Sequence, residues 1–133
     1  MEITAFIEKS ENNYYQISSD DELFGCCFGG YGNSLEEAKA DFLLSIEEAK
    51  EMAVEDGNNI DGITFDVVYK YDLPSFFAYF DFINVTQLAK RVGINESKMR
   101  QYKSGLAFAS EKTINKILSA IKDIGKELES AKL

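Results

Sequence analysis

The 133 residues contain no histidine, a single proline and two cysteines, the adjacent Cys26 and Cys27. Without histidine the chain cannot form a Ser-His-Asp triad, a Cys-His dyad or an HExxH zinc site, which removes much of the hydrolase repertoire. Two cysteines are too few for a disulfide framework or a zinc ribbon, so a reducing compartment fits best. We therefore expect a cytoplasmic protein.

Long apolar runs are also missing. No stretch approaches the roughly 18 consecutive apolar residues of a membrane span. The N-terminal sequence MEITAFIEKS lacks the basic region and the longer apolar run of a signal peptide. Hydrophobic residues still make up 45% of the chain, with ten phenylalanines and seven tyrosines. This is enough for the core of one ordinary domain or two small ones, in a soluble protein that makes no membrane contact.

Charge is distributed unevenly along the chain. The residues before Pro74 include 17 acidic and 4 basic side chains, a net charge of −13, whereas the remainder includes 6 acidic and 10 basic ones, a net charge of +4. Such asymmetry favours a basic nucleic-acid contact coupled to an acidic surface with another use. The alternative is that the acidic residues only keep a small domain soluble.

The first part predicts a βββαβ unit. Apolar and polar residues alternate from Ile3 to Ile7, which is typical of a strand, and the polar residues 10–13 provide a turn before a second strand, YYQIS. The glycine-rich sequence LFGCCFGGYG, which follows Asp20-Asp21-Glu22, predicts a third strand.

A capping box of Ser34 and Glu37 opens a helix of about twenty residues that ends at Gly57. The sequence ITFDVVYKY, from Ile63 to Tyr71, predicts a fourth strand, and the proline that follows marks a domain boundary. The sequence thus predicts an α+β protein with one domain over residues 1–73 and an all-α domain over residues 74–133.

The second part predicts helices alone. The apolar sequence SFFAYFDFI is a candidate short helix, and capping residues then begin three more, at Asn84, Asn95 and Ser110. Within the segment 85–104, Ala89 is a small residue where two helices would cross, and Gly93 suits a tight turn. Five apolar residues fall at the inward positions: Leu88, Val92, Ile94, Met99 and Tyr102.

This spacing predicts a helix-turn-helix that binds double-stranded DNA. Arg and Gln bond base edges in the major groove, while Lys, Ser and Asn anchor phosphates. The candidate DNA-binding residues are Thr86, Gln87, Asn95, Ser97, Lys98, Arg100, Gln101, Lys103 and Ser104. The alternative is a helical hairpin whose basic face is only solvated.

One such unit offers few base contacts, so we expect a homodimer that reads two half-sites, with a tetramer left open. The last helix, residues 111–128, is the candidate interface. Its apolar stripe suits either a dimer contact or an ordinary core: Ile114, Ile117, Leu118, Ile121, Ile124 and Leu128.

Taken together, the N-terminal hairpin and three motifs resemble the HicB-type antitoxins, the protein partners of HicA-type toxins. The motifs are the helix entry at Gly30 to Ala38, the YDLPSFF junction at Tyr71 to Phe77, and the run GINESKMRQYKSG from Gly93 to Gly105. The resemblance covers nearly the whole chain. One departure is the segment Gly29 to Asn33, which lacks the acidic residue that such domains commonly carry there.

The resemblance implies an N-terminal partial RNase H-like domain that binds and blocks a small messenger-cleaving ribonuclease. It also implies a C-terminal helix-turn-helix domain that represses the operon through operator DNA. It implies no catalytic residue, no metal and no cofactor. The candidate toxin contacts are acidic residues: Asp20, Asp21, Glu22, Glu37 and Asp41.

Two other functions are weighed against this one. The chain could be a stand-alone helix-turn-helix regulator whose N-terminal domain senses a small molecule or dimerises. It could also be a metal-dependent nuclease that uses carboxylates, a function that requires several of them to converge on one pocket: Glu8, Asp20, Asp21, Asp41 and Asp66. Nothing in the sequence shows such convergence, so we expect no enzymatic activity.

Overall fold

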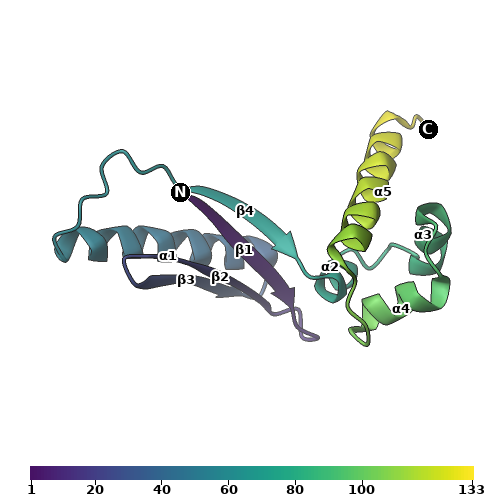
Figure 1. The fold of residues 1–133 in the computed structure, drawn as a ribbon, viewed down its shortest axis with the longest axis horizontal. Coiled ribbons are helices and arrows are strands. Elements are labelled where there is room, and N and C mark those ends of the chain that lie inside the picture. Colours follow the sequence, from purple (N-terminus) through teal and green to yellow (C-terminus); the bar gives the residue numbers. More distant parts are fainter. The chain divides into compact units, whose positions relative to one another are not determined.

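The computed structural model describes all 133 residues and has an α+β architecture with one mixed sheet of four strands and five helices (Figure 1). The strands and the first helix are β1 (Glu2–Lys9), β2 (Tyr15–Leu23), β3 (Cys26–Gly32), α1 (Leu35–Glu55) and β4 (Asp66–Tyr71). The remaining helices are α2 (Leu73–Tyr79), α3 (Val85–Val92), α4 (Glu96–Ser104) and α5 (Glu111–Ser130). None of these helices combines the length and the apolar composition of a membrane span.

The chain forms two compact units, residues 1–79 and residues 80–133. The division lies after Tyr79, whereas the sequence placed it before Pro74. Pro74 does not interrupt regular structure, because it occupies the first turn of α2, where a missing N–H is tolerated. Asp72 begins this helix by accepting hydrogen bonds from the Ser75 N–H at 2.7 Å and, through its carbonyl, from the Phe76 N–H at 2.8 Å.

Helix α2 belongs to the first unit because it packs on the sheet. Phe77 is buried, the Ser75 hydroxyl accepts a hydrogen bond from the Lys9 N–H at 3.3 Å, and the Tyr79 ring meets Tyr15 edge-on. Residues 74–79 carry no charged side chain, so the net charges of the two units stay at −13 and +4.

The sheet has the strand order β3-β2-β1-β4, with β4 parallel to β1 and the other pairs antiparallel. Strand β2 continues through Asp20–Glu22, a polar segment outside the predicted strands. The β2–β3 register is irregular between Ser18 and Glu22. Phe24 and Gly25 both have positive φ, as a two-residue hairpin turn requires. Consequently β3 begins at Cys26 rather than Leu23. Strand β4 is also shorter than expected and begins at Asp66 rather than Ile63.

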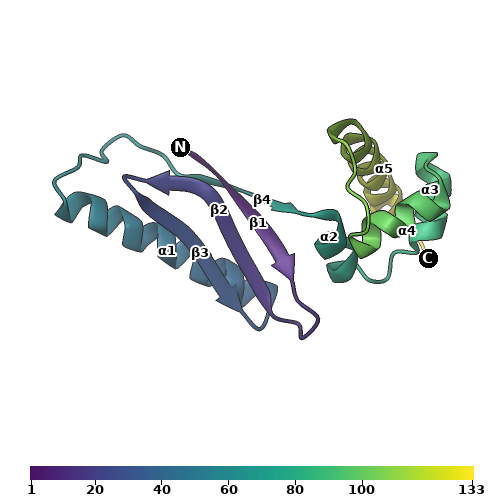
Figure 2. The ribbon, with the colours of Figure 1, turned by 60° about the horizontal axis from the view of Figure 1, so that its bottom comes forward.

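Helix α1 packs against β3 and β2 on one face of the sheet (Figure 2). The predicted alternation in β1 is confirmed, because Ile3, Ala5 and Ile7 are all fully buried. Along α1 the residues with helical spacing face this core: Ala38, Phe42, Ile46, Ala49 and Ala53. The predicted cap is confirmed as well, since the Ser34 hydroxyl accepts a hydrogen bond from the Glu37 N–H at 3.1 Å.

Strand β3 lies unusually close to the backbone of α1. A Cβ atom on Gly30 would lie 2.4 Å from the Phe42 nitrogen and 2.7 Å from the Ala38 oxygen, and one on Gly32 would lie 2.5 Å from the Ala38 nitrogen. All three distances are too short for a side chain. The glycines in this segment therefore permit the contact between strand and helix.

We expect Gly30→Ala to lower the free energy of unfolding by about 1–3 kcal/mol, because the new methyl group forces α1 away from β3. Gly29→Ala is the matched control on the same strand, since its nearest contact would be an ordinary 3.7 Å from the Ile17 oxygen. Chemical denaturation of the two variants checks the prediction, and equal stability of both would contradict it.

Candidate functional site

The helices α3 and α4 are joined by a tight turn built from local capping interactions. The Asn84 side chain accepts a hydrogen bond from the Gln87 N–H at the start of α3. At its end, the Ala89 carbonyl accepts hydrogen bonds from the N–H groups of Gly93 at 2.9 Å and Ile94 at 3.0 Å. Gly93 has a φ of 82°, a left-handed conformation that glycine adopts without a steric cost. Only two residues, Ile94 and Asn95, then separate this glycine from α4.

The inward positions of this pair are confirmed by their burial. Leu88, Val92, Met99 and Tyr102 are buried, and Ile94 is half-buried. Ala89, the small residue expected where the helices approach, is completely buried. The two helices thus share a core that leaves the opposite side of α4 in solvent.

The outward side of α4 carries most of the candidate DNA-binding residues. Gln101 is half-buried, and the others on this helix are exposed: Ser97, Lys98, Arg100, Lys103 and Ser104. Gln87 on α3 is exposed too. Arg100 Nη1 lies 3.4 Å from Thr86 Oγ1 and donates a hydrogen bond to it, so the first turn of α3 borders the same surface. Asn95, in contrast, caps α4, because its side chain accepts a hydrogen bond from the Lys98 N–H.

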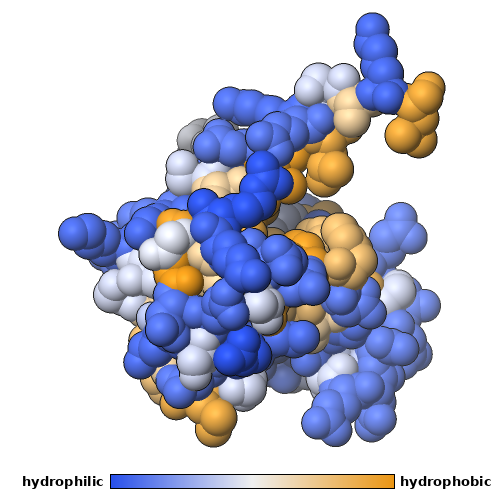
Figure 3. Space-filling view, turned by 90° about the vertical axis from the view of Figure 1, so that its right-hand side faces the viewer, coloured by the Kyte–Doolittle hydropathy of each residue, from blue (hydrophilic) through white to orange (hydrophobic).

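Ion pairs decide which cations on this surface remain available. Lys90 lies 3.7 Å from Glu96, and Arg91 lies 2.6 Å from Glu127 on α5. Three cations of α4 have no acidic partner within ion-pair distance: Lys98, Arg100 and Lys103. In Figure 3, where this end of the chain faces the viewer, hydrophilic residues dominate and hydrophobic ones form separate patches. An uncompensated positive face of this kind attracts phosphate groups.

The apolar stripe of α5 is only partly used inside the second unit. Ile117 is completely buried, and three isoleucines are half-buried: Ile114, Ile121 and Ile124. Leu118 and Leu128, by contrast, are 41% and 67% exposed. One part of the stripe therefore belongs to the core beside α3, and the other part remains on the surface.

In the first unit, two of the candidate toxin contacts accept hydrogen bonds from the backbone of β3 and of the residue that follows it. Asp41 accepts a hydrogen bond from the Tyr31 N–H and Glu37 accepts one from the Asn33 N–H, both at 2.9 Å. Ser45 completes the series by accepting a hydrogen bond from the Gly29 N–H at 3.1 Å. These three side chains of α1 satisfy alternate N–H groups at the outer edge of the sheet. The roles of Ser45 and Asp41 are not visible in the sequence, because they depend on β3 lying beside α1. The bond of Glu37 is local and accompanies the predicted capping box.

Asp21 also has an internal partner. Its carboxylate accepts hydrogen bonds from the Thr4 N–H at 2.8 Å and from the Ser19 hydroxyl at 3.3 Å. Strands β1 and β2 pair only from Phe6 to Lys9 of β1. The Asp21 carboxylate therefore takes the place of a β2 carbonyl as the acceptor for the Thr4 N–H. Of the five acidic candidates, Asp20 and Glu22 remain exposed without such a bond.

The structure gathers no group of three or more His, Cys, Asp or Glu side chains that could hold a metal ion. Asp21 and Asp41, two of the five carboxylates considered for a nuclease, bond to different strands.

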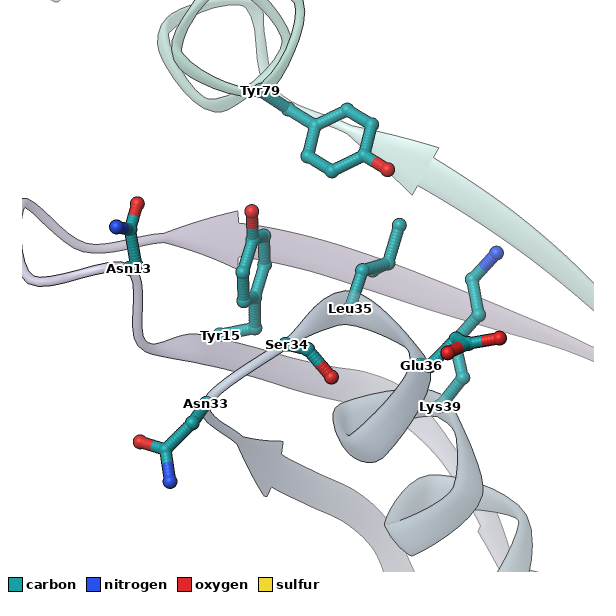
Figure 4. A pocket seen from close by; sticks show the side chains of 8 residues that line it. All are labelled: Asn13, Tyr15, Asn33, Ser34, Leu35, Glu36, Lys39 and Tyr79. Atoms are coloured by element: carbon teal, nitrogen blue, oxygen red, sulfur yellow. The ribbon is translucent and has the colours of Figure 1, made fainter.

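An open hollow of about 700 Å³ lies at the start of α1 (Figure 4). Tyr15 and Tyr79 line it from β2 and α2, Leu35 and Lys39 from α1. Next to it, the Tyr71 ring stacks on Tyr79. Burial, together with the neighbouring Tyr79 and Tyr15, raises the pKa of Tyr71 to about 12. The Tyr71 phenol is therefore neutral near pH 7. The hollow presents aromatic walls beside one lysine.

No protein-family model, curated protein or solved structure matches this chain.

We expect Asp41→Ala to expose the Tyr31 N–H, because the carboxylate bonded to it is removed. Amide hydrogen exchange at Tyr31 should become several-fold faster, and the free energy of unfolding should fall by about 1 kcal/mol. Glu48→Ala, an exposed change on the same helix, is the control. Unchanged exchange at Tyr31 would show that the bond to Asp41 does not protect this edge.

Proposed function

We propose that the chain is an antitoxin of the HicB type that also represses its own operon. In this proposal the second unit binds operator DNA, and the first unit binds and blocks a small, basic, messenger-cleaving toxin of the HicA type. The observation that carries the proposal is the division of charge, with −13 on one separately packed unit and +4 on the other.

Binding to DNA is supported by the geometry of α3 and α4. A short helix, a left-handed glycine and a second helix with a buried inner face are the parts of a helix-turn-helix. Helix α4 is then the recognition helix. Arg100 and Gln101 would meet base edges, while Lys98 and Lys103 would meet phosphates. Thr86 and Gln87 would contact the backbone from the start of α3.

A homodimer follows from the small size of this surface. One recognition helix reads only a few base pairs, and two-fold symmetry doubles the site. The exposed Leu118 and Leu128 of α5 are apolar side chains that a second copy could cover. Such a contact would join two copies of α4 in one dimer, so that each could read one half-site.

Neutralisation of a toxin is supported by the acidic surface of the first unit. In this proposal that unit would be the partial RNase H-like domain. Carboxylates that face a basic ribonuclease would cover the groups with which it binds RNA. Asp20 and Glu22 are the best candidates among the predicted contacts, because both are exposed and neither has an internal backbone partner. The other three candidates already accept backbone hydrogen bonds within the unit, so their first role is to stabilise the fold: Glu37, Asp41 and Asp21.

We expect Arg100→Ala and Gln101→Ala each to weaken binding to the upstream region of the chain's own gene by about tenfold to a hundredfold, as the loss of a base contact does. Lys122→Ala, an exposed change on α5, is the control and should have little effect. A gel shift at fixed salt measures this. Wild-type affinity in both α4 variants would exclude α4 as the recognition helix.

We expect the double variant Asp20→Lys, Glu22→Lys to weaken binding of the basic partner by at least tenfold without lowering the free energy of unfolding. The partner is the product of the adjacent gene, co-expressed and co-purified. Asp81→Lys, Glu129→Lys has the same change of charge on exposed residues of the second unit and is the control. If the neighbouring product neither binds nor arrests growth alone, the antitoxin proposal fails.

A second candidate is a stand-alone regulator whose first unit senses a small molecule. The hollow beside Tyr15 and Tyr79 favours it, because its aromatic walls and lysine suit a small aromatic or anionic ligand. This candidate retains DNA binding and requires no toxin. The co-purification experiment therefore separates the two functions.

A further inference from the structure

The two edges of the sheet are treated differently. The edge formed by β3 is closed, because Ser45, Asp41 and Glu37 accept hydrogen bonds from alternate N–H groups of the strand and its exit. Natural sheets often protect an edge in this way, since unpaired backbone groups attract further strands. The other edge, formed by β4, has no such cover from a helix.

Strand β4 pairs only with β1, and the direction of its free backbone groups follows from that pairing. The Asp66 N–H donates a hydrogen bond to the Met1 carbonyl on the β1 side. Because backbone groups alternate along a strand, those of Val68 and Lys70 also face β1, and those of Val67 and Tyr69 face outward. No side chain bonds the outward groups of Val67 or Tyr69.

The side chains of this strand are also incompletely covered. Helix α1 lies over β3 and β2, and a helix about 10 Å wide spans only two strands that are about 4.8 Å apart. Val67 and Tyr69 therefore remain half-buried on the helix side of β4, and Val68 is 37% exposed on the other side. The outward backbone groups of Val67 and Tyr69 and the apolar side chain of Val68 are therefore accessible to another strand.

We propose that β4 pairs in antiparallel fashion with β4 of a second copy, about a two-fold axis at Val68. In this register the outward groups of Val67 face those of Tyr69 in the second copy, as a hydrogen-bonded pair requires. Asp66 then lies opposite Lys70 of the second copy, and Lys70 opposite Asp66. The charges of one strand thus complement the same strand turned around, and two four-stranded sheets form one continuous sheet.

The charges also select this register over its neighbours. An axis at Tyr69 would place Asp66 opposite Asp72, and an axis at Lys70 would place two lysines opposite each other. An axis at Val67 would give neither charge a partner of opposite sign. Registers shifted by one residue are excluded, because they would set an outward residue opposite one that already faces β1.

The close approach of side chains strengthens this selection. Val68 pairs with itself, and Asp66 with Lys70, at positions without backbone hydrogen bonds, where opposing Cα atoms are only about 4.5 Å apart. A lysine on an edge usually discourages pairing. Here Asp66 of the second copy would compensate it. This interface involves only the first unit and holds whether or not the chain is an antitoxin.

Cross-linking of the full chain tests the register. In a background of Cys26→Ala, Cys27→Ser, we expect Val68→Cys to form a disulfide-linked dimer on mild oxidation, because the two thiols would face each other within reach. Lys70→Cys alone should not, whereas a mixture of Asp66→Cys and Lys70→Cys chains should link as a heterodimer. A monomeric Val68→Cys chain, or equal linking of Lys70→Cys, would overturn the proposal.

The mass of the full chain in solution, measured by light scattering, tests the charge pairs. We expect Lys70→Glu to weaken this self-association at least tenfold, and addition of Asp66→Lys in the same chain to restore it, because the pairs are then exchanged. Lys132→Glu gives the same change of net charge at the exposed C-terminus and is the control. No rescue in the double variant, or an equal loss in the control, would overturn the proposal. Circular dichroism verifies that each variant is folded.

Discussion

The contact between β3 and α1 is the interaction on which the first unit depends. Gly30 and Gly32 let the two backbones approach more closely than any side chain allows. Three side chains of α1 then accept hydrogen bonds from N–H groups of the strand and of Asn33, which follows it. Four helical residues advance by about 6 Å, nearly the length of two strand residues. Ser45, Asp41 and Glu37 therefore match Gly29, Tyr31 and Asn33 along an antiparallel pair.

Local signals predicted much of this molecule, because they act within one turn of the chain. The caps at Ser34, Asn84 and Asn95 and the left-handed Gly93 all lie where their sequence patterns place them. The sequence did not reveal the length of β2, since polar residues 18–22 lack the alternation of a strand. Nor did it reveal that α2 belongs to the first unit, which depends on tertiary packing.

The two candidate sites differ in the same way, because one depends on local spacing and the other on tertiary contacts. The outward face of α4 was predictable, since helical spacing alone determines which side chains share a face, and only its ion pairs had to be learned from the structure. The acidic candidates were a different matter. Asp21 and Asp41 look like surface charge in the sequence, yet each accepts a backbone hydrogen bond from a neighbouring strand. Glu37 differs from them, because its bond to the Asn33 N–H is local and accompanies the predicted capping box. A charge count cannot separate such residues from free ones.

The pairing of α1 side chains with the N–H groups of β3 limits the insertions and deletions that this protein can accept during evolution. A deletion or insertion of one residue between Glu37 and Ser45 would rotate every later side chain by about 100° and leave the strand's N–H groups facing the wrong residues. Point substitutions, in contrast, are tolerated on the solvent side of the helix. Lineages of this protein should therefore keep the length of α1 constant while their sequences drift, and length variation should collect in the loop of residues 56–65.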